Sequence, residues 1–398
     1  MARSGTGPAI PESSRLDETV NLLRDLVAFD TTSRNSNLPL IEFVADYLSD
    51  RGIATRLIPS ADGAKSNLFC TIGPDIPGGV VLSGHSDVVP VDGQDWATDP
   101  FALTEANDRL YGRGSADMKG FIACALAMTS RLTEMALHRP LHFAFSYDEE
   151  VGCLGVGRLI DVILSELPRP AAVIVGEPTG MQIATAHKGI CAMTTTIRGR
   201  EAHSSRPQDG VNAIGAAASL VSYLYRLCDD LAATARDDRF EPPHTTFNVG
   251  QISGGDAINI IARECLLKWE FRPIPGSDPA GIVARVEAWV EDELLPRMQA
   301  TDSSCSIENL CEFVVPPLDA TGGSVAETLA REATGLNSTG TIAFVTEASL
   351  FAEAGVPAIV CGPGDIAQAH QPDEFIEISQ LDACLGFIER IAQQSQPS

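Results

Sequence analysis

The sequence predicts an α/β protein in which one α/β domain is interrupted by a smaller inserted domain. Its length of 398 residues exceeds that of one average domain. Apolar strands alternate with amphipathic helices in the first and last parts of the chain, which is typical of an α/β layer architecture. Between them, the pattern changes to the βαββαβ order of a ferredoxin-like module. We therefore expect one domain to combine residues 1–186 and 317–398, and the inserted domain to cover residues 187–316.

The first outer segment contains two predicted helices, over residues 16–29 and 38–52, because apolar residues recur there at helical spacing. A long helix is also predicted over residues 117–135, where small residues line one face. Apolar runs predict four strands, and the continuous apolar character of the last two favours buried central strands. The four strands cover residues 66–73, 78–90, 141–147 and 171–180.

The inserted segment contains four predicted strands and two predicted helices. The strands cover residues 191–199, 245–255, 265–273 and 304–310. The amphipathic helices cover residues 209–227 and 280–295. The α/β pattern then resumes with a helix, a strand and a terminal helix, over residues 324–334, 356–364 and 378–394.

The composition limits the classes of partner. The chain has 28 Lys plus Arg against 53 Asp plus Glu, a net charge of −25, which argues against nucleic acid or an anionic membrane as a partner. No apolar run is long enough to cross a bilayer, and residues 1–18 lack the apolar core of a secretory signal. The ten cysteines contain no CxxC pair, which favours free thiols in a reducing compartment. We expect a cytoplasmic protein.

Metal-ligand side chains follow several of the predicted strands. Taken singly, each has an ordinary explanation, such as a buried core histidine, a helix cap or a loop carboxylate. Ligands of a doubly wound sheet, however, collect at the carboxyl ends of its strands. The residues in question are His85 and Asp87 in SGHSDVV, Asp117 in GRGSADMKG, Glu149 and Glu150 in YDEEVG, Glu177 in VGEPTG and His370 in GPGDIAQAHQPDE.

Two imidazoles and three or four carboxylates suit two divalent ions such as Zn²⁺, Co²⁺ or Mn²⁺, with one carboxylate and a water shared between them. This arrangement explains the adjacent Glu149 and Glu150. One glutamate ligates a metal, and its free neighbour takes a proton from the water that the metals acidify.

The motifs GHSDVVP, GRGSADMKG, YDEEVG, GEPTG, REAHSSRP and AHQPDE resemble those of the di-zinc aminoacylase and carboxypeptidase superfamily. Members of that superfamily hydrolyse amide bonds of N-acyl amino acids and short peptides. The segments FEPPHTTFNVG, FVTEASLF and CGPGDIAQAHQPDEF are similar to its acetylornithine deacetylase branch, which removes the acetyl group from Nα-acetyl-L-ornithine in arginine biosynthesis. The resemblance implies two metal ions, most simply Zn²⁺ with Co²⁺ as an alternative. It also implies a metal-binding catalytic domain with an inserted domain that serves dimerisation and as a lid.

The resemblance assigns roles to the motif residues one by one. His85 and Glu177 hold one metal, Glu150 and His370 hold the other, Asp117 bridges them, Glu149 is the general acid/base, and Asp87 orients His85. A cis peptide is implied between Asp117 and Met118.

For the inserted domain, the resemblance implies a homodimer in which His203 reaches the active site of the partner and stabilises the oxyanion. Asn259 and Arg272 match residues that bind the carboxylate and backbone of the substrate. The sequence departs from the family where Ala262 follows INII in place of proline.

Glu347 in FVTEASLF follows an apolar run. If its side chain is buried near the site, it needs a positive partner, and the side-chain ammonium of ornithine is the candidate. The alternative is a carboxylate favoured by the dipole at a helix N-terminus.

Three functional hypotheses remain open. The first is the metal-dependent deacetylase. The second is a related N-acyl-amino-acid deacylase, a succinyl-diaminopimelate desuccinylase or a dipeptidase; FVTEASLF lacks the arginine expected of the desuccinylase. The third is a binding protein that kept the fold without catalysis, which the complete set of ligand residues disfavours.

Overall fold

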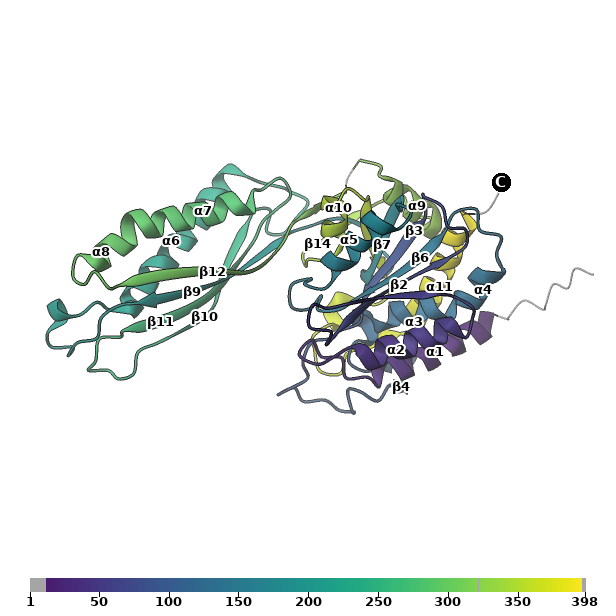
Figure 1. The fold of residues 1–398 in the computed structure, drawn as a ribbon, viewed down its shortest axis with the longest axis horizontal. Coiled ribbons are helices and arrows are strands. Elements are labelled where there is room, and N and C mark those ends of the chain that lie inside the picture. The colour runs from purple at the N-terminus through teal and green to yellow at the C-terminus, as the bar shows by residue number, and fades with distance from the viewer. Residues whose placement is uncertain (1–11, 321, 396–398) are drawn as a thin grey trace, which may run out of the picture. The chain divides into compact units, whose positions relative to one another are not determined.

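The computed structural model describes residues 12–320 and 322–395, and the chain divides into two compact units (Figure 1). The first unit comprises Met1–Thr185, Ala320–Gly340 and Thr346–Ser398; the second comprises Ala186–Asp319 and Thr341–Val345. The division expected from the sequence had its boundaries at residues 186/187 and 316/317 and left residues 341–345 with the outer segments. Part of the polar N-terminal segment considered above, residues 1–11, lies outside the described residues.

Most strands of a nine-stranded mixed sheet belong to the first unit. The strands lie in the order β1 (Thr55–Pro59), β2 (Ser66–Ile72), β6 (Leu141–Ser146), β3 (Val80–His85), β7 (Ala172–Pro178), β15 (Ala358–Gly362), β8 (Ala184–His187) and β13 (Leu318–Asp319), and β14 (Gly340–Ile342) pairs with β8. The four central strands, β6, β3, β7 and β15, run parallel, whereas β2 is antiparallel to β6.

Helices cover both faces of this sheet (Figure 1), as a parallel sheet requires. One core cluster contains apolar residues of α1 (Glu12–Val27), α2 (Leu38–Ser49), α3 (Gly120–Ala127), α9 (Val325–Thr334) and α11 (Ile378–Gln393). On the other face, α5 (Val156–Glu166) packs on β2 and β6, and α10 (Ala348–Glu353) packs on β7 and β15. The α/β prediction is therefore confirmed.

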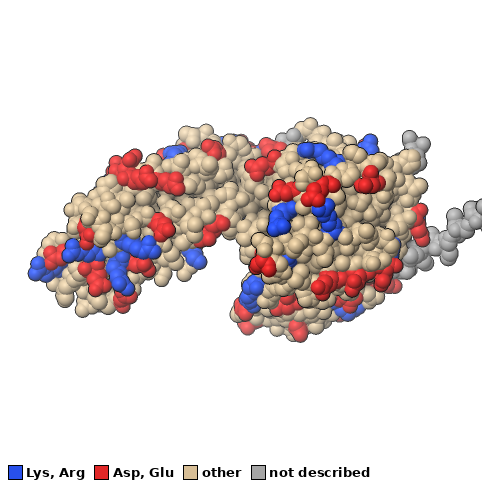
Figure 2. Space-filling model, viewed as in Figure 1, with Lys and Arg blue, Asp and Glu red and all other residues tan. Residues whose placement is uncertain are grey.

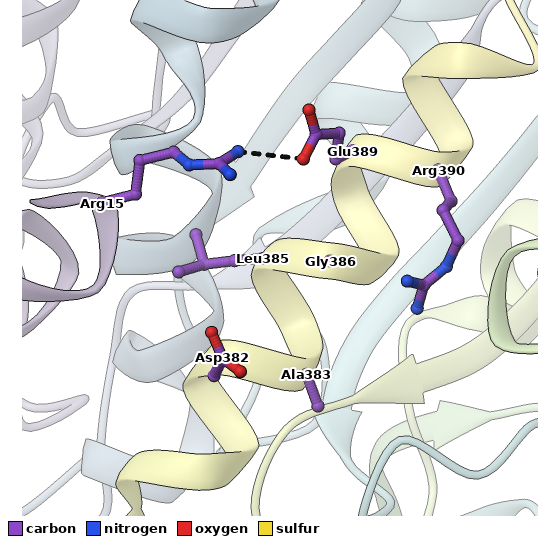
Figure 3. Close-up of a pocket in the computed structure, with 7 residues that line it drawn as sticks. All are labelled: Arg15, Asp382, Ala383, Leu385, Gly386, Glu389 and Arg390. Atoms are coloured by element: carbon purple, nitrogen blue, oxygen red, sulfur yellow. Dashed lines mark hydrogen bonds and ion pairs between the residues drawn. The ribbon is translucent and has the colours of Figure 1, made fainter. Parts of the chain in front are cut away.

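A pocket beside α11 is lined by Arg15 of α1 and by charged and small or apolar residues of α11 (Figure 3). Arg15 donates to Glu389 across 2.9 Å, and the Arg390 side chain donates to the carbonyl of Ala333. Arg15 and Arg390 thus have their hydrogen-bond partners within the protein, so we interpret the pocket as a gap in the packing of these helices and not as a ligand site.

One element prediction was wrong in detail, and one helix was not predicted. The helix expected over residues 117–135 is interrupted: Ser115–Lys119 forms a turn in which Asp117 and Met118 have non-helical dihedrals, and α3 and α4 (Thr129–Glu134) follow. The N–H of Asp117 donates to Glu374 instead of to a helical carbonyl. The local sequence around Asp117 contains no pattern that predicts this contact. The sequence analysis also missed α5, although its buried Val156, Leu159, Ile160 and Ile163 have helical spacing.

A small three-stranded sheet joins two segments that are distant in sequence. Its order is β16 (Phe375–Glu377), β5 (Arg109–Tyr111) and β4 (Thr104–Ala106). Phe375 pairs with Tyr111. The sheet thereby places the segment after β5 next to the segment before β16.

The second unit has the expected βαββαβ order. Its antiparallel sheet runs β10 (Thr246–Gly254), β11 (Glu264–Arg272), β9 (Ile190–Arg198) and β12 (Ser306–Val315). Its helices are α6 (Ala213–Thr234), α7 (Pro279–Trp289) and α8 (Leu295–Gln299), with a wider turn over Val290–Leu294 between the last two. Alternate strand residues are buried with the helices in one core. The ferredoxin-like prediction is confirmed.

On the face shown in Figure 2, acidic and basic side chains occur in small interspersed groups on both units. Within residues 12–320 and 322–395, no helix combines the length and the apolar character needed to cross a membrane.

His142 provides a test of the core on β6. Its side chain is 2% exposed, stacks on Phe69 with ring centroids 5.2 Å apart, and places Nδ1 2.9 Å from Thr71 Oγ1. Burial lowers the pKa of His142 to about 4, against the opposing charge of Asp75. In the unfolded chain the pKa is about 6.5. The unfolded state therefore binds more protons than the folded state between these two pH values.

We expect His142 to lower the free energy of unfolding progressively as the pH falls from about 6.5 to about 4, by about 3 kcal/mol in total. Denaturant unfolding at several pH values measures this loss. His142→Gln is the control, because it keeps a polar side chain and removes the titration. An equal pH slope for the variant and the wild type would contradict the prediction.

Candidate dinuclear metal site

The candidate site lies at the carboxyl ends of parallel strands in the first unit. His85 is the last residue of β3, Glu149 and Glu150 follow β6, and Glu177 lies near the end of β7. Because β3 is parallel to both β6 and β7, these strand ends meet at one edge of the sheet. All four residues belong to segments that the sequence analysis selected.

The carboxylate of Asp117 lies between the two histidines. Its Oδ1 is 3.0 Å from His85 Nε2, and its Oδ2 is 3.5 Å from His370 Nε2. Each carboxylate oxygen thus faces a different imidazole. This is the arrangement that a carboxylate shared by two metal ions requires.

Each histidine also faces a glutamate. Glu177 Oε1 lies 3.6 Å from His85 Nε2, and Glu150 Oε2 lies 3.0 Å from His370 Nε2. Two overlapping sets of donor atoms lie within 4.8 Å of one another, namely His85, Asp117 and Glu150, and His85, Glu149 and Glu177. Glu149 is therefore close enough to be a ligand itself.

The site concentrates negative charge in a buried environment. Burial raises the pKa of Glu149 and Glu177 well above the usual value, and it raises the pKa of Glu150 to about 7, with a further contribution from Asp117. Hydrogen bonds to Asp117 and Glu150 raise the pKa of His370 to about 10. A cation is the natural partner for such a cluster.

The residues present fit divalent metal ions. Within the described part of the chain, Glu150 Oε1 and Glu177 Oε1 are buried without a hydrogen-bond partner. Buried polar atoms are normally paired, and both orphaned oxygens belong to carboxylates that face an imidazole. Imidazole and carboxylate ligands suit Zn²⁺ and related borderline ions.

Asp87 contacts both His85 and the two adjacent glutamates. The imidazole Nδ1 of His85 lies 2.9 Å from the main-chain oxygen of Asp87 and 3.6 Å from its carboxylate. The carboxylate instead accepts the N–H of Glu149 (3.1 Å), the N–H of Glu150 (3.3 Å) and the hydroxyl of Ser33 (2.7 Å). Asp87 thus holds the backbone of both glutamates, and its carbonyl holds the histidine.

Glu347 is buried beside β3, the strand that ends at His85. Its side chain is 1% exposed, and its Oε2 accepts a long hydrogen bond of 3.4 Å from Ser83 Oγ. Burial raises the pKa of Glu347 to about 7. It precedes α10 without capping the helix through its side chain, and its Oε1 has no hydrogen-bond partner in residues 12–320 and 322–395.

His203, Asn259 and Arg272 belong to the second unit. His203 is exposed, and its Nδ1 accepts the N–H of Ser205 at 3.1 Å. Asn259 lies in an exposed segment, and its neighbour Ile260 forms an isolated antiparallel β-bridge with His203. Arg272 ends β11 and donates to Glu270 across 3.1 Å. Ala262, where the family has proline, is buried, and its carbonyl accepts the N–H of Ala213.

Several residues that hold the ligand segments in place, namely the buried Arg113 and Glu374 and the partly buried Gln94, were not predicted from the sequence. Arg113 and Glu374 form an ion pair of 2.8 Å, and Gln94 donates to the carbonyl of His370. Arg113 and Glu374 stand inside the motifs GRGSADMKG and AHQPDE, so their position beside ligand candidates was a usable signal.

The family model described as "Peptidase family M20/M25/M40" matches residues 81–394. An acetylornithine deacetylase from Myxococcus xanthus is 38% identical over 373 residues, which cover 92% of this chain and 95% of that relative. A solved M20 family metallo-carboxypeptidase from Sulfolobus solfataricus has a TM-score of 0.77 at 18% identity, covering 95% of this chain and 99% of its own. A dinuclear metal binding peptidase of the M20 family from Bacillus subtilis has a TM-score of 0.64 at 13% identity, covering 96% and 98%.

The two solved structures share the fold, and the cluster offers candidate ligands suited to two divalent ions. The family match and the aligned relative identify a metallohydrolase that acts on amide bonds. The chain belongs to peptidase family M20/M25/M40.

Proposed function

We propose that the protein is an acetylornithine deacetylase, which hydrolyses Nα-acetyl-L-ornithine to L-ornithine and acetate in arginine biosynthesis. The observation that carries the proposal is the Asp117 carboxylate, placed between His85 and His370, in a chain that aligns over 92% of its length with a relative of that activity. Other N-acyl amino acids, succinyl-diaminopimelate and dipeptides are the alternative substrates. Human carnosine dipeptidase 1 shares the fold, with a TM-score of 0.72 at 18% identity over 96% of this chain and 98% of its own.

Two divalent ions, Zn²⁺ with Co²⁺ as the alternative, would be held by His85 with Glu177 and by His370 with Glu150, with Asp117 shared. Bound there, the ions would polarise the scissile carbonyl and acidify a water molecule. The orphaned oxygens of Glu150 and Glu177 support these assignments.

Glu149 is the proposed general acid/base. Its main chain is held by Asp87, and Cys153 Sγ donates to its Oε1 across 3.5 Å. These contacts support a role in which the carboxylate takes a proton from the attacking water and returns it to the departing amine.

His203 is proposed to stabilise the tetrahedral oxyanion in the active site of a partner subunit, with a homodimer formed through the second unit. Because Nδ1 accepts the N–H of Ser205, a neutral His203 carries its proton on Nε2. The exposed ring thus offers an N–H donor, which an oxyanion requires. Asn259 would bind the backbone of the substrate, and Arg272 would bind its carboxylate through the fork of the guanidinium.

We propose a cytoplasmic location for the protein, which suits its free cysteines.

Turnover of a panel of Nα-acyl amino acids and dipeptides by Zn²⁺- or Co²⁺-reconstituted protein tests this function, with amine release as the readout. Nα-acetylornithine should have the highest kcat/KM of the panel. A higher value for a succinylated substrate or a dipeptide would assign the protein to another member of the family.

Glu347 is the proposed partner of the ornithine ammonium, and its unpaired Oε1 supports this role. Contact with a substrate requires that oxygen to be uncovered, because the side chain is 1% exposed. If the contact forms, Glu347→Gln should raise KM about tenfold for Nα-acetylornithine and far less for Nα-acetylmethionine, since one charge-assisted hydrogen bond is lost. Equal effects on the two substrates would leave Glu347 with a structural role.

A further inference from the structure

The buried carboxylate of Glu374 binds the backbone of the segment that carries Asp117. Its Oε1 accepts the N–H groups of Ala116 (2.9 Å) and Asp117 (3.1 Å), and its Oε2 accepts the N–H of Gly114 (2.9 Å). Arg113 Nη1 donates to Oε2 at 2.8 Å. The exposed side-chain fractions of Arg113 and Glu374 are 1% and 0%. Four donors therefore converge on one carboxylate that water does not reach.

The same ion pair is joined to the segment that carries His370. Arg113 Nη2 donates to Gln94 Oε1 at 2.5 Å, and Gln94 Nε2 donates to the carbonyl of His370 at 2.9 Å. Asp373 accepts the N–H of Ala97 at 2.8 Å. His370 has φ of +63°, in the left-handed region that a histidine rarely adopts, so its backbone must be held by neighbouring contacts.

We propose that Glu374 is a positioning residue that sets the distance between Asp117 and His370, and thereby the geometry of the second metal position. The carboxylate fixes the Asp117 segment, and its own main chain leads back to His370 four residues earlier. Arg113 and Gln94 complete the connection from the other side. The inference rests on the proposed metal ligands, but Glu374 itself contacts neither ligand side chain.

Charge and geometry both matter in this contact. A carboxylate accepts hydrogen bonds at both oxygens, whereas a glutamine replaces one acceptor with an NH₂ donor. Glu374→Gln would therefore place a donor against either the Gly114 and Arg113 side or the Ala116 and Asp117 side. One of the two sides must move, and Asp117 or its connection to His370 moves with it.

The test is the affinity for Zn²⁺, measured by competition with a chelator in the absence of substrate. Glu374→Gln should bind at least one of the two ions about 10- to 100-fold more weakly, which is the usual effect of removing a contact that supports metal ligands. Glu327→Gln is the matched control. Glu327 is also a buried glutamate of the first unit that accepts a backbone N–H, from Gly323, and an Arg331 N–H. Glu327→Gln should lower the free energy of unfolding by a comparable amount and keep wild-type affinity for both ions.

Equal Zn²⁺ affinities in Glu374→Gln and Glu327→Gln would overturn the proposal. If Glu374→Gln does not fold, Gln94→Ala carries the test, because it removes the Gln94 contacts to Arg113, Trp96 and the His370 carbonyl and leaves the backbone contacts of Glu374 in place. This variant should bind one of the two ions several-fold more weakly, and unchanged affinity would refute the connection to His370. A wild-type protein that binds fewer than two Zn²⁺ would instead refute the proposed metal site. Two bound ions without acetylornithine turnover would refute only the proposed substrate.

Discussion

Replacing Glu149 by glutamine should lower kcat for Nα-acetylornithine by about 10³-fold, since positioned general acid/base groups contribute 10²- to 10⁴-fold. Metal content should stay at the wild-type value, because the proposed ligand sets are complete without Glu149. The structure makes this a sharp test, as Glu149 lies within 4.8 Å of donor atoms of His85 and Glu177. Steady-state kinetics together with elemental analysis of dialysed protein provide the measurement.

Glu150→Ala is the control for Glu149→Gln. Glu150 Oε2 lies 3.0 Å from His370 Nε2, so its removal should release one ion as well as activity. Loss of metal from Glu149→Gln, with retention in Glu150→Ala, would exchange the roles of the two glutamates.

His203→Ala should lower kcat by about 10²-fold or more, because removing one oxyanion donor costs 10²- to 10³-fold. If His203 acts in the partner subunit, mixing His203→Ala chains with Glu149→Gln chains should restore activity. In a mixed dimer, the site that keeps Glu149 would receive an intact His203 from the other chain. With random exchange, about a quarter of wild-type activity should return, since half of the dimers are mixed and half of their sites are complete.

The mixing experiment needs proof that subunits exchange. Mixed dimers purified through two different tags supply this proof, and their activity can then be measured directly. Inactive mixed dimers would place His203 in its own subunit's site or outside catalysis. A monomeric wild-type protein would refute the homodimer and with it the action of His203 across subunits.

The sequence alone was sufficient to predict the class of fold and the segments of the candidate metal site. Continuous apolar runs mark the central strands, and the polar residues directly after them fall at the edge where β3, β6 and β7 end. This works because apolar alternation and strand ends are local features, and parallel neighbours bring their carboxyl ends together. The structure places His85, Asp117, Glu150, Glu177 and His370 in one cluster. Their roles as ligands stay predictions.

Only the tertiary structure shows how those residues are held. The sequence suggested a continuous helix from Asp117, but the helix is interrupted. The resemblance implied that Asp87 orients His85, and the structure shows that the Asp87 carbonyl makes this contact while its carboxylate binds the main chain of Glu149 and Glu150. The N–H of Asp117 is bound by Glu374, which is 257 residues away in the chain. A hydrogen bond between segments so far apart leaves no periodic pattern in the sequence, because it depends on how the strands β5 and β16 pair and on the burial that follows.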